Sequence, residues 1–281
     1  MIRRVLCRAA LVAAAATLAT AAQADAPSSG LVALETGVLG QGWEAVGRID
    51  IGARGFCTGA LIAPDLVLTA AHCLYDRDTG ARLTDAELHF RAGWRNGRAA
   101  AERSVRRSAV HPDYRHGGQV KSATVAHDLA LLQLAHPIRQ GSIAPFAVQS
   151  DPRRGDDVGV VSYARGRSEV PSLEERCRVL QRDPNGVVML SCSADFGASG
   201  APVFALRDGQ VRIVSVISAK AETNGPAGAE AVSLGVSLGP RLDALRMALA
   251  AGDTRFIQVG PQDRDTPRTM SAGGGARFVR P

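Results

Sequence analysis

The sequence predicts an all-β protein, built as barrels or a sandwich, with one helix near its C-terminal end. Many short apolar or alternating runs follow one another, separated by Gly, Pro, Asp and Asn. Asp-Pro-Asn-Gly at 183–186 and Arg-Asp-Gly at 207–209 are typical hairpin turns. One late segment, residues 240–251, has helical spacing, with Leu242, Leu245, Met247 and Leu249 on one side and Gly252 at its end.

Each predicted strand is a run of apolar or alternating residues bounded by turn formers. The predicted strands are residues 43–51, 56–62, 66–69, 88–92, 129–134, 157–164, 179–181, 187–190, 203–206, 211–217 and 232–236.

Residues 1–24 are predicted to be a signal peptide. Three arginines precede an apolar run, and Ala22-Gln23-Ala24 has the small-residue pattern of a cleavage site. A membrane anchor is the alternative, but the run is short and mostly alanine. We therefore expect a mature chain that begins near Asp25, is secreted or periplasmic, and contacts no membrane after the signal is removed.

The net charge of the mature chain is too small to indicate a nucleic-acid partner, and none is expected. The full chain has 33 basic and 27 acidic residues, and removing three signal arginines leaves 30 against 27, a net charge of +3. The local cluster of Arg103, Arg106 and Arg107 is interpreted as a solvated strand face or loop. Residues 25–42 and 253–281 are predicted to be a flexible N-terminal or pro-segment and a flexible tail.

Four cysteines remain after Cys7 leaves with the signal, and an even number in an exported chain predicts two disulfides. Of the three possible pairings, the short separation within each half favours Cys57 with Cys73 and Cys177 with Cys192. Each bond closes a loop of about 15 residues, worth roughly 3 kcal/mol in the chain-entropy model. A metal site is disfavoured because there is no C-x-x-C and no histidine near the second pair.

Ser199 lies in Gly197-Ala198-Ser199-Gly200, just before an apolar strand. Glycines permit a tight turn that presents the hydroxyl and directs amides at one point, as acyl transfer by a serine requires. Such a turn alone is a weak signal, since short motifs of this kind are common.

A base and an orienting acid for this serine are found earlier in the chain. His72 ends the stretch Leu66-Val67-Leu68-Thr69-Ala70-Ala71-His72-Cys73, so a half-cystine would hold it rigidly. Asp128 leads an apolar strand, where its buried charge needs a partner such as an imidazole N–H. His127 is a rival base, but strand alternation directs it away from the face of Asp128.

Together these motifs resemble the chymotrypsin/trypsin-like serine peptidases, in that family's order of His, Asp and Ser. The resemblance runs over about residues 46–238, includes Cys57-Thr58-Gly59-Ala60-Leu61-Ile62, and is greatest to bacterial exported members related to the glutamyl endopeptidases. It implies two six-stranded antiparallel β-barrels, residues 43–145 and 146–252, the second followed by the C-terminal helix. It implies a triad of His72, Asp128 and Ser199, and an oxyanion hole from the amides of Gly197 and Ser199. It also implies a protein or peptide substrate, a monomer, and neither cofactor nor metal.

The resemblance also gives expectations about specificity. Ser193 aligns with the floor of the primary pocket, and Val214, Ser215, Val216 and Ile217 with its wall and the substrate-pairing strand. Ser215 is implied to support the triad acid, and Ile217 to narrow the pocket. No histidine follows residue 140, so the histidine of glutamyl enzymes has no counterpart. A small or medium uncharged side chain is expected before the cut, although Asp195 would favour a basic one if it entered the pocket.

Three departures and alternatives stay open. Ala198 stands where animal members carry an Asp that pairs with a newly cut N-terminus, so that activation route is not expected. A hydrolase of the esterase type would order its triad Ser, Asp, His, but no histidine follows Ser199. A catalytically impaired binding protein on the same scaffold is the second alternative, disfavoured because all three candidate residues are present.

Overall fold

The computed structural model describes residues 30–117, 121–149, 152–225, 228–252 and 277–279. The predicted signal peptide lies outside the described residues, as does most of the predicted tail. Two parts of the segments predicted to be flexible are instead paired strands, β1 (Leu31–Ala33) and β14 (Arg277–Val279).

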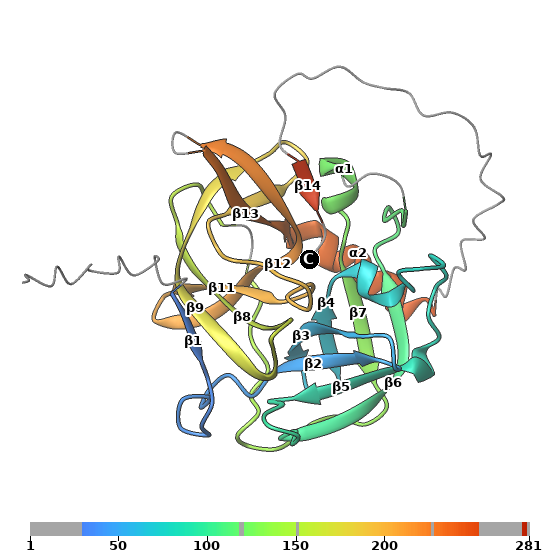
Figure 1. The fold of residues 1–281 in the computed structure, drawn as a ribbon. Coiled ribbons are helices and arrows are strands. Elements are labelled where there is room, and N and C mark those ends of the chain that lie inside the picture. Colours follow the sequence, from blue (N-terminus) through green and yellow to red (C-terminus); the bar gives the residue numbers. More distant parts are fainter. Residues whose placement is uncertain (1–29, 118–120, 150–151, 226–227, 253–276, 280–281) are drawn as a thin grey trace, which may run out of the picture.

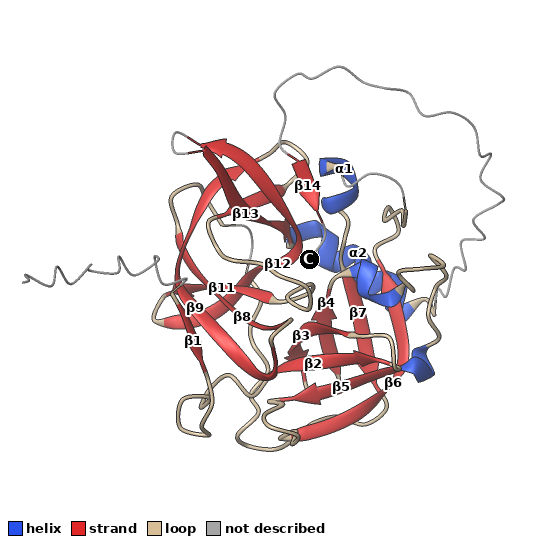
Figure 2. Ribbon diagram, in the orientation of Figure 1, coloured by secondary structure: helices blue, strands red, loops and turns tan. Residues whose placement is uncertain are grey.

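The first half of the chain forms a closed antiparallel barrel in the order β2-β3-β4-β7-β6-β5 (Figures 1 and 2). Alternation explains its inward faces: in the stretch 88–92, Leu88, Phe90 and Ala92 are buried and the two residues between them are partly exposed. The strands are β2 (Val46–Ile51), β3 (Phe56–Ala63), β4 (Leu66–Thr69), β5 (Leu88–Ala92), β6 (Ala101–Val110) and β7 (Ala130–Leu134).

The second half forms another ring of six strands, because β8 pairs with both β9 and β11 and so closes the path β9-β10-β13-β12-β11-β8. Its strands are β8 (Asp157–Ala164), β9 (Arg167–Arg182), β10 (Val187–Leu190), β11 (Pro202–Arg207), β12 (Gln210–Gly225) and β13 (Gly228–Ser237). Strand β1 adds to β9, and β14 adds to β12. The predicted all-β class with two barrels is therefore confirmed.

Helix α2 (Gly239–Ala250) is the predicted late helix. It buries Leu242, Leu245 and Leu249, whereas Met247, predicted on the same side, is 67% exposed. Residues three or four positions apart share one face of a helix. Met247 is only two positions from Leu245, so it lies on a different face. The shorter helices are α1 (Ser122–Val125), η1 (Ala71–Leu74) and η2 (Asp85–Glu87). No helix among the described residues is long and apolar enough to span a bilayer.

Strand β6 and most of β9 are missing from the predicted strands. Both carry many charged residues on their outer faces, so their apolar residues do not form a continuous run. Strand β9 is held from both sides by β8 and β10, which supplies the order that its own sequence does not indicate.

Apolar packing joins the two barrels into one body. Each barrel has its own buried interior, and a third cluster contains Leu68 and Leu131 of the first barrel with Phe204 and Val216 of the second. Both predicted disulfides are present, Cys57–Cys73 in the first barrel and Cys177–Cys192 in the second. The barrels therefore hold residues from distant parts of the sequence in fixed relative positions.

Candidate active site

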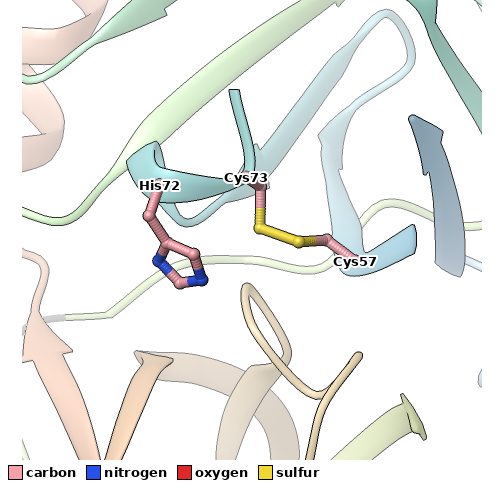
Figure 3. A group of neighbouring side chains, drawn as sticks. All are labelled: Cys57, His72 and Cys73. Carbon is pink, nitrogen blue, oxygen red and sulfur yellow. A yellow bond between two sulfur atoms is a disulfide. The ribbon is translucent and has the colours of Figure 1, made fainter. Parts of the chain in front are cut away.

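His72 is held on a short and fully buried turn. The 3-10 helix η1 begins at Ala71, directly after β4, and its Cys73 is bonded to Cys57 of β3 (Figure 3). The two sulfur atoms beside His72 are bonded to each other, so neither is a thiolate ligand for a metal. This cross-link joins the imidazole turn to the neighbouring strand, as a rigid mount for a base requires.

Asp128 binds His72 through both carboxylate oxygens. The backbone N–H of His72 donates to Oδ1 at 2.8 Å, and Nδ1 of the ring lies 2.6 Å from Oδ2. A carboxylate can only accept here, so Nδ1 carries the hydrogen and Nε2 is left with the lone pair. The side chains are 6% and 1% exposed, which keeps the pair away from water.

A serine hydroxyl also supports Asp128, but it belongs to a different serine from the expected one. The side chain of Ser218 donates to Asp128 Oδ2 at 2.5 Å, whereas the hydroxyl of Ser215 donates to the carbonyl of Val236 at 2.9 Å. The assignment of Ser215 to this role is therefore wrong by three residues. Ser218 lies at a bulge: Ile217 pairs with Gly235 and Ala219 with Leu234 of β13, so Ser218 is the extra residue of β12.

The same shift changes the expected pocket wall. Val214, Val216 and Ile217 are fully buried in the apolar cores, and none of them lines the cavity beside His72. If Ser218 takes the place expected for Ser215, then Lys220 takes the pocket-lining place that the resemblance implied for Ile217. Its ammonium lies 3.7 Å from Asp195 Oδ1, so the carboxylate that was expected to attract a basic side chain already has a cationic partner.

Ser193, the expected pocket floor, contacts a carboxylate that the sequence analysis missed. Its N–H donates to Glu174 Oε2 at 2.8 Å, and its hydroxyl lies 3.4 Å from Oε1. Burial raises the pKa of Glu174, and the two bonds from Ser193 act against that rise. Glu174 lies in β9 without any local motif, so only the pairing of distant strands could have revealed it.

The turn that carries Ser199 requires glycine at both ends. Gly197 and Gly200 have φ of +98° and +79°, and a Cβ on Gly197 would lie 2.3 Å from the ring of Phe56. A Cβ on Gly200 would meet Thr69 and the backbone of Thr58 and Ala70. The serine turn thus packs directly against the end of β4, three residues before His72.

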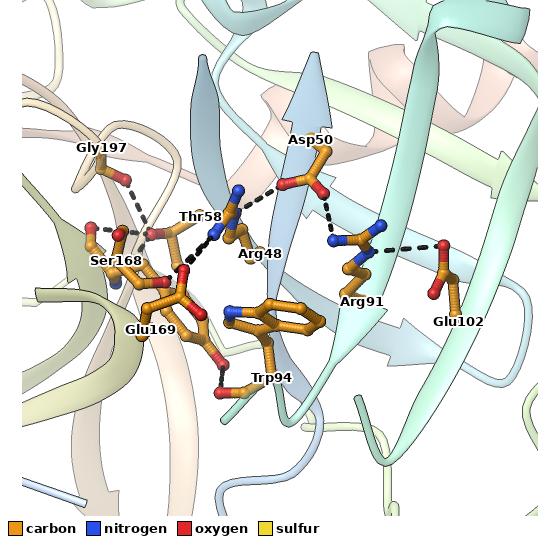
Figure 4. Close-up of polar contacts among 10 residues, drawn as sticks. Arg48, Asp50, Thr58, Arg91, Trp94, Glu102, Ser168, Glu169 and Gly197 are labelled. Carbon is orange, nitrogen blue, oxygen red and sulfur yellow. Dashed lines mark hydrogen bonds and ion pairs between the residues drawn. The ribbon is translucent and has the colours of Figure 1, made fainter. Parts of the chain in front are cut away.

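Thr58 of β3 ties this turn to the first barrel (Figure 4). Its N–H donates to the carbonyl of Ser199 at 2.9 Å, and its hydroxyl donates to the carbonyl of Gly197 at 2.8 Å. The same hydroxyl accepts the N–H of Tyr163 from the second barrel at 3.1 Å. One residue therefore holds the serine turn and a strand of each barrel together.

A chain of ion pairs continues this connection across the molecule (Figure 4). Arg48 of β2 binds Asp50 at 2.5 Å and reaches Glu169 of β9 at 3.1 Å. Arg91 of β5 extends the chain by pairing with Asp50 at 2.8 Å and with Glu102 at 3.3 Å. Arg48 is mostly buried, but the side chain of Glu169 is 54% exposed, so solvent partly screens this bridge between the barrels.

The geometry leaves a proton acceptor and an amide donor available. His72 Nε2 is buried and has no hydrogen-bond partner among the residues that the structure describes. Within the same described set, the N–H of Gly197 makes no backbone or side-chain hydrogen bond. His72 and Gly197 both line one cavity, so a carbonyl compound bound there would lie near a base and a donor.

This cavity has a volume of about 400 Å³, and no residue of β12 is among the residues that line it. It is lined by the β2–β3 turn, by η1 and the residues after it, by the β8–β9 turn, and by Phe196 and Gly197. The guanidinium of Arg165 lies 4.2 Å and that of Arg77 5.4 Å from the ring centroid of Phe196. Burial lowers the pKa of Arg77, and the charge of Arg165 lowers it further, so two cations share this wall.

The rival histidine, His127, faces another histidine. Its ring centroid lies 4.8 Å from that of His111, and Asp113 Oδ2 lies 4.0 Å from His111 Nδ1. Burial, and then the neighbouring His127, lower the pKa of His111 to about 4. The nearby charge of Arg241 lowers the pKa of both rings, and this positive potential also opposes a bound cation.

Comparison with known proteins gives one consistent result. The family described as trypsin-like peptidase domain matches residues 57–212, more than half of the chain. Trypsin Blo t 3 of Blomia tropicalis is 26% identical over 156 residues, which cover 53% of this chain and 53% of that protein. Human kallikrein-10 is 38% identical over 87 residues, covering 30% of this chain and 29% of that protein.

Two further matches complete the comparison. Human serine protease 56 is 32% identical over 112 residues, covering 40% of this chain and 17% of that protein. The chain thus spans about half or less of the length of these curated relatives. A structure of Glu endopeptidase in complex with MPD superposes with a TM-score of 0.61 at 18% identity, covering 80% of this chain and 98% of that one, and this likeness concerns the fold alone.

Proposed function

Because the chain belongs to the family of trypsin-like peptidase domains, we propose that it is an exported serine endopeptidase that acts through an acyl-enzyme. The observation that carries the proposal is the pairing of His72 with Asp128 beside the glycine turn of Ser199. Export is supported by the signal-like residues 1–24 and by the two disulfides, which persist in oxidising compartments.

In this mechanism His72 Nε2 takes the proton of the Ser199 hydroxyl while its oxygen attacks the carbonyl carbon of the scissile bond. The negative charge that develops on the carbonyl oxygen is stabilised by the N–H groups of Gly197 and Ser199. His72 then gives the proton to the leaving amine, and the C–N bond breaks. Water attacks the resulting ester by the same route, which restores the serine hydroxyl.

Asp128 acts by position and charge. Its Oδ2 keeps the hydrogen on Nδ1, so Nε2 is the basic nitrogen, and it stabilises the imidazolium that forms in each half of the reaction. Ser218 fixes the carboxylate in turn. We expect Ser199→Ala and His72→Ala each to lower kcat by roughly 10⁶-fold, and Asp128→Asn by about 10⁴-fold.

A fluorophosphonate probe tests the proposal directly. The wild-type chain should be labelled and Ser199→Ala should not, while digestion of casein separates a peptidase from an esterase. An unlabelled but correctly folded wild type would instead favour a binding protein on this scaffold. Near-full activity in a purified Asp128→Asn variant would refute the choice of acid.

A further inference from the structure

Strand β12 has an edge that β11 covers only in part. Strand β11 pairs with β12 from Gln210 to Val216, and Ile217 bonds with the backbone of Gly200 and Ala201. On the opposite edge, β13 pairs with β12 from Ser215 to Gly225. The edge of β12 that faces β11 is therefore outside that ladder from Ser218 onward.

The C-terminal strand β14 lies on this edge (Figure 1). It pairs antiparallel with β12, Val279 opposite Lys220 and Arg277 opposite Glu222. Lys220 also pairs with Ser233 of β13. Because a strand has two edges, β14 must occupy the one that β11 leaves uncovered.

The direction of β14 points its end toward the serine turn. The antiparallel register runs from Glu222 to Lys220, that is, toward Ser218. Lys220 is three residues from Ile217, whose carbonyl accepts the N–H of Gly200, and three residues of strand span about 10 Å. An extended chain on this edge would thus lead directly to Ser199.

The resemblance already places the acyl half of an extended substrate on this strand. We propose that the chain's own strand Arg277–Val279 occupies the same edge of β12 and acts as an intramolecular competitor. The inference rests on the proposed function. Strand addition of this kind uses main-chain hydrogen bonds, so it accepts segments of different sequence, including one from the same molecule.

The tether makes such competition effective even when the strand binds weakly. Because β14 belongs to the same chain as β12, its pairing is intramolecular, and covalently joined segments typically meet at effective concentrations in the millimolar range. A strand with a dissociation constant of about 1 mM would then occupy the edge in about half of the molecules or more. Releasing it should lower KM at least about twofold and leave kcat unchanged.

The test uses the full chain with Val279→Pro, which removes an N–H and cannot continue the ladder. The matched control is Ser271→Pro, which adds the same residue outside β14. We expect Val279→Pro to raise kcat/KM at least about twofold through KM, and Ser271→Pro to equal the wild type. A synthetic peptide of residues 270–281 should inhibit Val279→Pro competitively at millimolar concentration. Unchanged kinetics in Val279→Pro together with no inhibition by the peptide would overturn the inference.

A binding measurement separates this inference from the proposed function. A fluorescent peptide of residues 270–281 should bind the Ser199→Ala, Val279→Pro double variant more tightly than Ser199→Ala with its own tail, by fluorescence anisotropy. Equal affinities would refute the tail contact even in an active enzyme. A chain that neither cleaves peptides nor reacts with the fluorophosphonate, yet shows this difference, would refute the proposed function and keep the tail contact.

Discussion

Replacing Thr58 by valine tests whether one buried hydroxyl holds the catalytic turn in place. The hydroxyl donates to the carbonyl of Gly197 at 2.8 Å and accepts the N–H of Tyr163 at 3.1 Å. Valine has nearly the same shape, so the change leaves those two buried groups without a partner. Each such loss costs about 1–3 kcal/mol, so we expect the free energy of unfolding to fall by about 2–4 kcal/mol.

The change should also reach catalysis, because the carbonyl and the amide of Gly197 belong to adjacent peptide groups. When the carbonyl loses its anchor, the Gly197 amide, which we propose as an oxyanion donor, should be less well oriented. Removing such a donor entirely costs about 10²–10³ in kcat, so a misdirected one should cost on the order of tenfold. The bond from the Thr58 N–H to Ser199 survives the substitution, which limits the loss.

Urea unfolding followed by the fluorescence of Trp43 and Trp94, together with kcat on a peptide substrate, measures both effects. Thr58→Ser keeps the hydroxyl and is the matched control, with an expected loss below about 1 kcal/mol. If Thr58→Val lost less than about half a kcal/mol and kept kcat within about twofold, the hydroxyl would not anchor the turn.

Further predictions concern the acid, a buried histidine and the cavity beside His72. Ser218→Ala should lower kcat about tenfold because Asp128 loses a charge-assisted bond, whereas Ser215→Ala should not; equal effects would contradict the assignment. The pKa of His111 is about 4 when folded and about 6.5 when unfolded, so burial of the neutral ring stabilises the fold fully above pH 6.5. As the pH falls to about 4 the stability should drop by about 3 kcal/mol, and less in His111→Asn, by urea unfolding at each pH. We expect the cavity that Arg165 lines to receive the residue after the cut, so Arg165→Gln should lower kcat/KM about threefold to tenfold for peptides with Glu there and leave matched Gln peptides unchanged.

Local sequence patterns are enough to predict the elements whose contacts are made between residues close together in the sequence. Strands β4, β5 and β8 begin and end where alternation and turn residues predict, since most of their buried residues are apolar. The two disulfides followed from cysteine separation alone. The pairing of His72 with Asp128 joins two residues that the sequence indicates independently, His72 by its rigid turn and Asp128 by its buried charge.

Local sequence patterns do not predict contacts that depend on strand register or on strands distant in the sequence. Glu174 reaches Ser193 because β9 passes beside the loop before the serine turn, and no spacing in the sequence indicates that approach. The cations around Phe196 come from three separate segments, with Lys220 5.7 Å from the ring centroid on the side of β12. Each contact needs the complete arrangement of both barrels.

The bulge at Ser218 bears on two proposed roles of β12, which are the support of Asp128 and the pairing of an extended peptide on its edge. An extra residue turns one side chain out of the alternation and bends the strand, so the hydroxyl reaches Asp128 and the edge beyond it leaves the ladder with β11. Deleting Ser218 should therefore impair both the acid and the peptide-pairing edge, lowering kcat and raising KM together. Ser218→Ala keeps the bulge and should lower kcat alone. If both variants changed only kcat, the edge of β12 would not depend on the bulge, and the strand contact of β14 would need another origin.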